Sequence, residues 1–331
     1  MILKLFNGKF LLLQIGIIIA FLALMMNHNV SLYPPNGFGP LYGLVFNWLQ
    51  GHTLAIFITY FALLIIEGLL LQLIVSYYKL VPRDNFIILL VYFLLSFSNP
   101  SLTSINPVVI ASTLTTWGLF RLLSISELEN TLPNLFTAGF LFSTASLVYG
   151  NMIWFIVFLI IGLMVLSLFR GRELLISLIS FAIPYLFLLT YGFIFDQEFI
   201  FWNQFHFNYG EWSFFSNGIQ LWLSIATFFI TILLSIYAVV NVMLQLFSKL
   251  IQIRKSTSLI FTLLIISTLL QFLSGPWWFS HPTLIFIPLS ILLSIFFAEL
   301  KNTFYFNLII LSIIILEIVQ LYYTNYAQAL S

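Results

Sequence analysis

Groups that could perform acid–base chemistry are few in this chain. Its 331 residues include four histidines, ten acidic residues and no cysteine. Disulfides, thiolate chemistry and Cys-ligated metals are therefore excluded, and proton transfer would depend on imidazoles and carboxylates. We predict as catalytic candidates two histidines and three acids: His52, Asp196, Glu198, Glu211 and His281.

Residues that could bind a substrate accompany these candidates. Indole rings offer stacking surfaces, and imidazoles donate or accept hydrogen bonds. The candidate substrate-binding residues are His28, His206, Trp202, Trp212, Trp277 and Trp278. The alternative interpretation is that the tryptophans form an interfacial belt and that the histidines and acids are solvated loop residues.

The spacing of the histidines bears on cofactors. The four are far apart in the sequence, with no short motif such as H-x-x-x-H. We therefore predict no cofactor, with a divalent metal as the alternative because imidazole binds zinc or iron. The sequence also has no phosphate-binding glycine loop, no serine nucleophile elbow and no basic patch for nucleic acid.

The composition indicates which elements must position these residues. The chain is 62% apolar and 6% charged, whereas about a quarter of the residues of a soluble domain are charged. In lipid, backbone groups must be satisfied within helices or a closed barrel. The apolar runs are continuous rather than alternating, so we predict an all-α polytopic transmembrane bundle that forms a single domain over residues 1–331.

The bilayer core is about 30 Å thick and requires roughly 20 helical residues per span. We predict about eleven spans, with nine to twelve as the range. They are 10–26, 54–78, 86–98, 106–123, 134–149, 152–169, 174–195, 219–247, 258–273, 282–298 and 303–323. The first follows Lys4 and Lys9 without a small-x-small cleavage site, so we interpret it as a retained helix. Because some spans are short, 86–123 and 134–169 could alternatively be re-entrant hairpins.

With the N-terminus inside, every basic residue falls on the cytoplasmic side, as the positive-inside rule predicts. These eleven residues are Lys4, Lys9, Lys79, Arg83, Arg121, Arg170, Arg172, Lys249, Arg254, Lys255 and Lys301. We therefore predict a multi-pass inner-membrane protein with a cytoplasmic N-terminus and a periplasmic or extracytoplasmic C-terminus. The outer connections are then 27–53, 196–218 and 274–281, which hold all the catalytic and substrate-binding candidates.

Two polar features interrupt the outer side of the predicted spans. Turn residues at 34–40 precede a predicted interfacial helix, Leu41–Leu49, with Tyr42 and Trp48 as its membrane anchors. Asn99-Pro100 and Asn106-Pro107 bracket a short polar segment. We favour a helical hairpin turn there over the floor of an outward cavity.

Two acids, Glu67 and Glu317, lie within predicted spans. Burying a charge at the bilayer centre costs at least about 2.5 kcal/mol, so both are functional candidates. Apart from Arg121, at the inner end of span 106–123, no basic residue lies within a span to pair with them. We expect each to be protonated, bonded to Ser, Asn or Gln neighbours, or facing a wet cavity.

Several segments resemble an uncharacterised bacterial family of polytopic inner-membrane proteins. They are Phe120-Arg121-Leu122-Leu123-Ser124, Asn134 to Tyr149, Arg170-Gly171-Arg172, Ala182-Ile183-Pro184-Tyr185 through Phe195-Asp196, and His281-Pro282-Thr283 through Ile287-Pro288-Leu289-Ser290. The resemblance covers most of the chain and implies a membrane location without an established activity.

More distantly, the chain resembles the C-type glycosyltransferase superfamily, whose members take a sugar from a polyprenyl-phosphate donor at the outer leaflet. The similarity lies in the span count, the interfacial helix at 41–49, the large outer loop 196–218 and the segment from His281-Pro282 into Ile287-Pro288-Leu289. The chain departs from that pattern in two ways: residues 27–53 contain no acid, and the predicted outer side contains no Lys or Arg. His52 or His28 would replace the acid, and His281, with or without a divalent ion, would contact the phosphate.

The resemblance implies roles for the outer candidates. One of His52, Asp196, Glu198 and Glu211 would take the acceptor's proton, and His206 or His281 would hydrogen-bond the departing phosphate. The sugar would stack on Trp202, Trp212, Trp277 and Trp278.

Two other function classes remain as alternatives. A non-catalytic subunit of a larger envelope complex would account for the missing outer cations and the missing acid. A transporter would show broken helices meeting at mid-membrane, for which Glu67 and the 99–107 segment are the candidates. The predicted partners are membrane lipid, a polyprenyl-phosphate sugar and other membrane subunits, and no nucleic acid.

Overall fold

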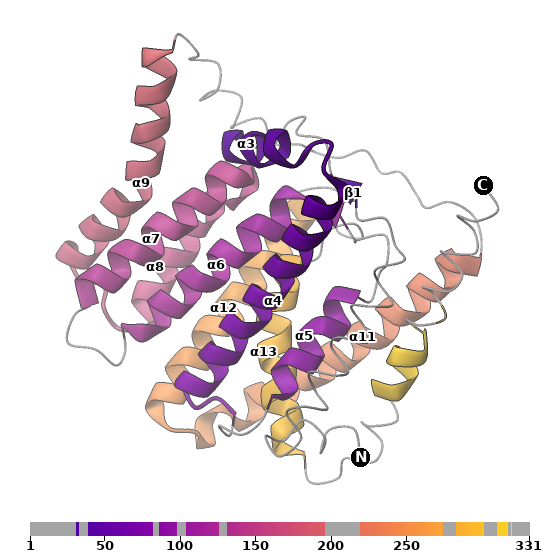
Figure 1. Cartoon of the computed structure of the whole chain (residues 1–331). Coiled ribbons are helices and arrows are strands. Elements are labelled where there is room, and N and C mark those ends of the chain that lie inside the picture. The colour runs from indigo at the N-terminus through magenta and orange to yellow at the C-terminus, as the bar shows by residue number, and fades with distance from the viewer. Residues whose placement is uncertain are drawn as a thin grey trace.

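The computed structural model describes residues 31–32, 39–81, 86–97, 104–125, 131–195, 219–273, 283–300, 310–316 and 319. These residues form a helical bundle (Figure 1). Six described helices are long and apolar enough to cross a membrane, which confirms a polytopic membrane protein. They are α4 (Thr53–Tyr77), α6 (Pro107–Ser124), α7 (Thr131–Val148), α9 (Gly171–Ile194), α11 (Ile219–Gln245) and α12 (Ile251–Leu273).

Shorter elements complete the described part of the chain. The shorter apolar helices are α5 (Ile87–Phe97), α8 (Phe155–Val165) and α13 (Thr283–Glu299), and the 3-10 helix η3 (Gly150–Trp154) precedes α8. The helix α3 (Pro40–Leu49) precedes α4, and the 3-10 helix η4 (Leu246–Ser248) follows α11. The two-residue strands β1 (Ser31–Leu32) and β2 (Ser104–Ile105) pair in parallel.

Each predicted span from 54–78 to 282–298 corresponds to one of these helices, although α12 begins at Ile251, seven residues before the predicted 258. Predicted span 10–26 lies outside the described residues, and residues 310–316 of the last predicted span are helical. Helices α6 and α7 each have 18 residues. By contrast, α5 has 11 residues and is only about 16 Å long at 1.5 Å per residue. Of the segments that could be re-entrant rather than membrane-spanning, only α5 and the η3–α8 segment are therefore short enough to keep that alternative.

The Asn106-Pro107 pair is a helix start rather than a break. The Oδ1 atom of Asn106 accepts a hydrogen bond from the Val109 amide at 2.9 Å, and Pro107 occupies the first helical position. An asparagine cap satisfies a free amide, and proline has no amide to leave unsatisfied there. The Asn99-Pro100 pair lies outside the described residues.

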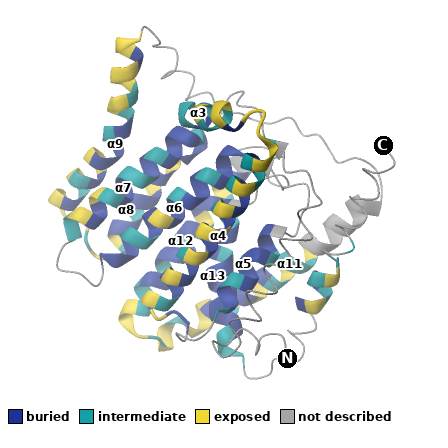
Figure 2. Ribbon diagram, in the orientation of Figure 1, coloured by how far each residue is buried: buried dark blue, intermediate teal, exposed yellow. Residues whose placement is uncertain are grey.

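The centre of the bundle is packed through small residues and hydroxyl groups. The Phe142 ring of α7 lies over Gly118 of α6, and Gly139 of α7 faces Ser180 of α9. The Ser143 hydroxyl donates to the Phe181 carbonyl at 2.6 Å. Such contacts are typical between membrane helices, because lipid provides no hydrophobic force to bring helices together. Buried residues accordingly line the facing sides of these helices, while exposed residues run along much of α9 (Figure 2).

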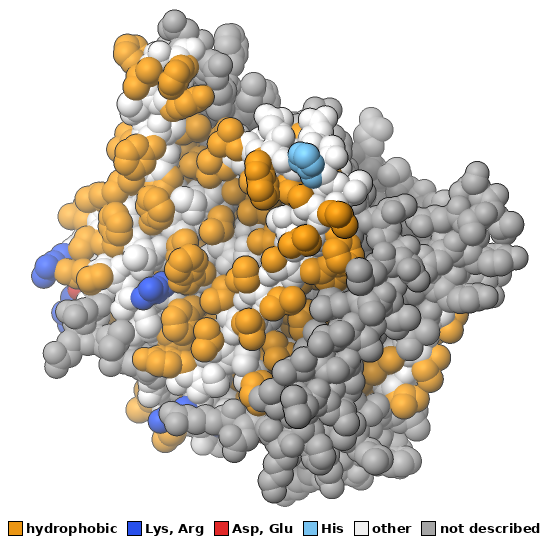
Figure 3. Space-filling model, viewed as in Figure 1, with side chains coloured by type: hydrophobic (Ala, Val, Ile, Leu, Met, Phe, Trp, Pro, Cys, Tyr) orange, Lys and Arg blue, Asp and Glu red, His pale blue; other side chains and the backbone are white. Residues whose placement is uncertain are grey.

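The described basic residues lie at one end of the bundle. They follow α4, end α6, begin α9 and surround the η4–α12 turn: Lys79, Arg121, Arg170, Arg172, Lys249, Arg254 and Lys255. The described histidine, His52, precedes the first residue of α4 at the other end. Figure 3 shows a histidine side chain well apart from the basic side chains. This separation agrees with the charge asymmetry of the sequence, whose basic end the positive-inside rule assigns to the cytoplasm.

That assignment predicts a labelling result. Because the natural chain has no cysteine, single cysteines can be introduced without background. Gln50 and Gly171 are exposed at opposite ends, and neither substitution removes a charge. We expect a membrane-impermeant maleimide to label Gln50→Cys in intact cells and Gly171→Cys only after permeabilisation. The reverse pattern would contradict the predicted orientation.

Candidate functional site

Of the candidates predicted for the outer face, the structure describes His52. It is exposed in the turn between α3 and α4. Its amide donates to the Leu49 carbonyl at 3.0 Å, and its own carbonyl accepts from the Ile56 amide at 3.0 Å. Gly51, with φ of 87°, allows this tight turn because glycine has no Cβ to clash in that conformation. His52 is therefore held between two helix ends with its side chain accessible.

The other candidates fall outside the described residues. They are His28, Asp196, Glu198, Trp202, His206, Glu211, Trp212, Trp277, Trp278, His281 and the intramembrane acid Glu317. Except for His28 and Glu317, they belong to two segments bounded by described helices: 196–218 connects α9 to α11, and 274–282 connects α12 to α13. Within the described residues, no group of three or more His, Cys, Asp or Glu side chains could hold a metal.

The helix α3 lies at the end of the bundle opposite the basic residues, across the end of α7 (Figure 1). It confirms the helix predicted at 41–49 and begins one residue earlier. Tyr42 was expected to anchor it in the membrane interface, and this was wrong. Tyr42 is fully buried and donates to the Ile105 carbonyl at 2.9 Å, because this face of α3 packs on the bundle. Trp48 does point outward, with 70% of its surface exposed.

The start of α3 is held against the α7 backbone. The Gly39 amide donates to the Val148 carbonyl at 3.2 Å, and a Cβ at Gly39 would overlap the Leu147 carbonyl oxygen. Only glycine allows so close an approach. The β1–β2 pairing and the Tyr42 hydrogen bond attach residues 31–32 and the start of α3 to residues 104–105. These tertiary contacts fix where α3 lies relative to the spans.

Glu67 lies deep inside the bundle. It is 1% exposed, and the Ser112 Oγ atom of α6 lies 2.8 Å from its Oε2 atom, within hydrogen-bond distance. This contact confirms the expectation of a serine, asparagine or glutamine neighbour. Tyr92 of α5 also interacts with Glu67, and Ser96 and Tyr60 interact with Tyr92. We call these five residues the Glu67 cluster.

Hydrogen bonding within the Glu67 cluster is incomplete. Oε1 of Glu67 and the hydroxyls of Tyr92 and Ser96 form no hydrogen bond of good geometry with the described residues. All three side chains are at most 6% exposed. Buried polar atoms are satisfied in more than nine cases out of ten, roughly, so three such atoms close together are unusual. Within the described residues, no ion pair involves Glu67.

Sequence reasoning missed Tyr92, Ser96 and Ser112. The available signal was the hydroxyl-rich stretch Ser112 to Thr116 within an otherwise apolar span. A buried acid at the basic end, Glu173, was also missed; its Oε2 atom has no hydrogen-bond partner among the described residues. Hydroxyl groups are common in membrane helices, so sequence alone does not indicate which one faces an acid.

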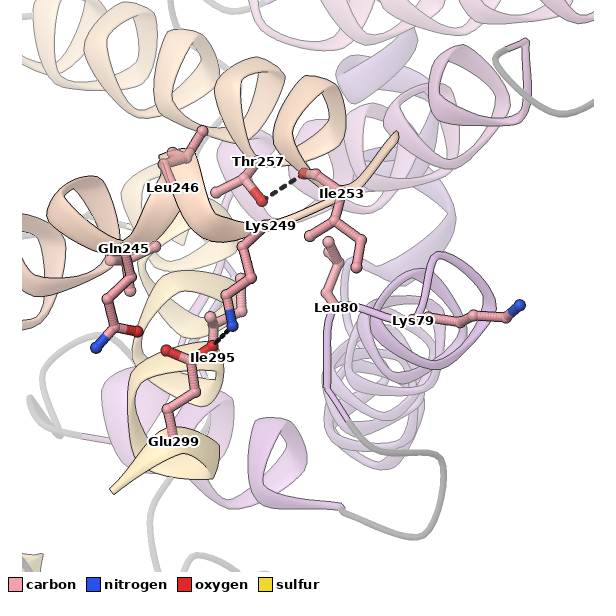
Figure 4. A pocket seen from close by; sticks show the side chains of 10 residues that line it. Lys79, Leu80, Gln245, Leu246, Lys249, Ile253, Thr257, Ile295 and Glu299 are labelled. Carbon is pink, nitrogen blue, oxygen red and sulfur yellow. Dashed lines mark hydrogen bonds and ion pairs between the residues drawn. The ribbon is translucent and has the colours of Figure 1, made fainter. Parts of the chain in front are cut away.

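A pocket opens at the basic end of the molecule. It lies between the end of α4, the η4–α12 turn and α13 (Figure 4). Lys249 and Glu299 form an ion pair within it, and Lys79 points away from that pair. The pair leaves little net charge inside the pocket. None of the predicted site residues lines it.

Comparisons with protein-family models, with curated proteins and with solved structures found no match. The resemblances to a bacterial inner-membrane family and to C-type glycosyltransferases stay predictions.

Proposed function

We propose that this integral membrane protein acts on a polyprenyl-phosphate-linked sugar at the outer membrane surface, as a C-type glycosyltransferase-like enzyme. The observation that supports this function is α3. A lipid-linked donor keeps its chain in the leaflet and its phosphate at the interface, so its enzyme needs a surface at that depth. One face of α3 buries Tyr42 and Leu49, while Leu44 and Trp48 are 66% and 70% exposed. A short helix of this kind suits the membrane interface.

Among the described residues, His52 is the candidate base beside this surface. It follows the last residue of α3 by three positions, and its side chain is exposed. An imidazole can act as a general base that takes a proton from an acceptor hydroxyl. In the proposed mechanism, Asp196, Glu198 or Glu211 assists the base, and His206 or His281 hydrogen-bonds the phosphate. The sugar stacks on Trp202, Trp212, Trp277 and Trp278.

The test is a transfer assay with the protein in proteoliposomes. The probe is undecaprenyl phosphate carrying a radiolabelled hexose, with one preparation for each of several hexoses. We expect the label to leave the lipid fraction for at least one probe. Because positioned acid–base groups contribute roughly 10²–10⁴-fold, His52→Ala, Glu211→Ala and His281→Ala should each lower turnover about 100-fold or more.

The matched control is Gln50→Ala, which changes an exposed side chain in the same α3–α4 turn. It should keep the turnover of the natural chain. The function would be refuted if no probe is consumed by folded protein. The assigned residues would be wrong if all three variants retain full turnover.

A further inference from the structure

The Glu67 cluster lies too far from the outer face to take part in the proposed transfer chemistry. Glu67 follows the first residue of α4, Thr53, by 14 positions, or about 21 Å at 1.5 Å per residue. About 15 Å of helix separates it from Tyr77 at the other end. Its carboxyl group therefore needs an explanation of its own.

A count of hydrogen atoms indicates the state of the carboxyl group. The Ser112 Oγ atom lies 2.8 Å from Glu67 Oε2 and also 2.8 Å from the Val109 carbonyl oxygen. A serine hydroxyl has one hydrogen, and a carbonyl has none. Two full hydrogen bonds require two hydrogens, so the second must belong to the carboxyl group. Glu67 then donates to Ser112, and Ser112 donates to Val109.

Neighbouring hydroxyl groups support that direction. Thr113, Thr115 and Thr116 of α6 all donate to backbone carbonyls three or four residues earlier. Ser112 makes the same kind of hydrogen bond when its hydroxyl donates to the Val109 carbonyl, three residues earlier. A neutral carboxylic acid also avoids the cost of a buried charge without a basic partner.

The opposite side of the carboxyl group faces α5. A Cβ on Gly68 would lie 3.5 Å from the Tyr92 ring, so α4 and α5 approach closely beside Glu67. The Tyr92 hydroxyl can donate to Oε1, and the Ser96 hydroxyl can donate to Tyr92. Among the described residues, Tyr92 and Tyr60 are the titratable groups near Glu67, and neither carries a charge at neutral pH.

We propose that Glu67 is the centre of a proton-binding site within the membrane, formed with Ser112 of α6 and Tyr92 of α5. In the protonated state, the carboxyl O–H donates to Ser112. When the proton leaves to water, the Ser112 hydrogen turns from the Val109 carbonyl to the carboxylate. Tyr92 then supplies the second donor, so both states have hydrogen-bond partners. Protonation thereby changes the hydrogen bonds between side chains of α4, α5 and α6.

Infrared difference spectroscopy of the full chain in lipid vesicles tests this site. The natural chain should show the carbonyl stretch of a protonated, hydrogen-bonded carboxylic acid, and this band should disappear when the pH is raised. Glu67→Gln should remove the band. The matched control Glu299→Gln, which changes the carboxylate paired with Lys249, should leave it unchanged.

A second variant reports on the hydrogen bond without removing the acid. Ser112→Ala should move the band to higher frequency, because a carboxylic acid that loses its acceptor has a stiffer carbonyl. Ser112→Thr, which restores a hydroxyl, should move it back. This measurement remains valid even if Glu67→Gln fails to fold.

Three outcomes would overturn the proton site. The first is the lack of any protonated-carboxyl band that depends on Glu67, at any pH. The second is loss of the band at constant pH when sodium replaces choline, which would make the cluster a sodium site. The third is a band that does not respond to pH. None of these outcomes depends on transferase activity.

Discussion

Gly39→Ala is expected to destabilise the protein by about 2–3 kcal/mol, within the range for overpacked sites. The added Cβ would overlap the Leu147 carbonyl oxygen and lie 2.6 Å from the Leu147 carbonyl carbon and 2.9 Å from that of Val148. These are backbone atoms of α7, which cannot shift without moving the helix. The start of α3 would have to lift, losing the hydrogen bond from Gly39 to Val148. Thermal unfolding in detergent micelles would measure the loss.

The matched control is Gly43→Ala, four residues further along α3. A Cβ at Gly43 would have no neighbour within 4 Å. Alanine is more favourable than glycine inside a helix by about 0.8–1 kcal/mol, so this variant should be neutral or slightly more stable. The changes in stability caused by Gly39→Ala and Gly43→Ala should therefore have opposite signs. Equal melting temperatures for the two variants would contradict the packing of α3 on α7.

The Gly39→Ala variant also tests whether the proposed transfer site at α3 and the Glu67 cluster act independently. If α3 holds the lipid-linked substrate, Gly39→Ala should lower transfer even at temperatures where the protein stays folded. The Glu67 infrared band should not change, because the cluster lies on other helices and deeper in the membrane. A loss of both signals would indicate general unfolding instead.

Phe142→Ala is expected to destabilise the bundle by about 3 kcal/mol or more. The Phe142 ring is 0% exposed, and its centroid lies 5.5 Å from that of Phe155 and 5.6 Å from that of Phe158. It also covers Gly118, where a Cβ would lie 2.6 Å from the ring. Truncation would leave a cavity between α6, α7 and α8, with the loss of the contacts that hold membrane helices together. Thermal unfolding in micelles again provides the measurement.

Phe136→Ala, on the same helix, is the control for Phe142. The Phe136 side chain is 38% exposed and stacks only on Phe140 among the described rings. Lipid or detergent can fill the space that it leaves, so the expected change is small. In addition, Gly118→Ala should be better tolerated together with Phe142→Ala than alone. Additive effects of these two substitutions would contradict the contact.

The positions of the spans could be predicted closely. Span 54–78 corresponds to α4 at Thr53–Tyr77, and span 219–247 to α11 at Ile219–Gln245. Length and apolar composition determine these elements, because only a continuous helix satisfies its backbone in lipid. Local chemistry determined the start of α6 at Asn106-Pro107 in the same way.

The candidate site could be predicted only in part. Glu67 could be identified because an acid within an apolar span costs free energy to bury. His52 could be identified because the chain has few groups capable of acid–base chemistry. Their surroundings could not be found in this way. Tyr42 was assigned to the membrane interface, although it is buried and bonded to Ile105. An amphipathic pattern would have shown which face is buried in a soluble helix, but in lipid both faces are apolar.

The sequence by itself determined that the chain is a helical membrane protein, approximately where its described spans lie along the chain, and how its charges divide between two ends. The tertiary structure decided which residues meet: Ser112 with Glu67 across 45 residues, Phe142 with Gly118, and Gly39 with the α7 backbone. The physical reason is that hydrophobicity fixes how deep a helix lies in the membrane but not its rotation about its own axis. That rotation is set by close packing and interhelical hydrogen bonds, which depend on the shapes of all neighbouring helices together.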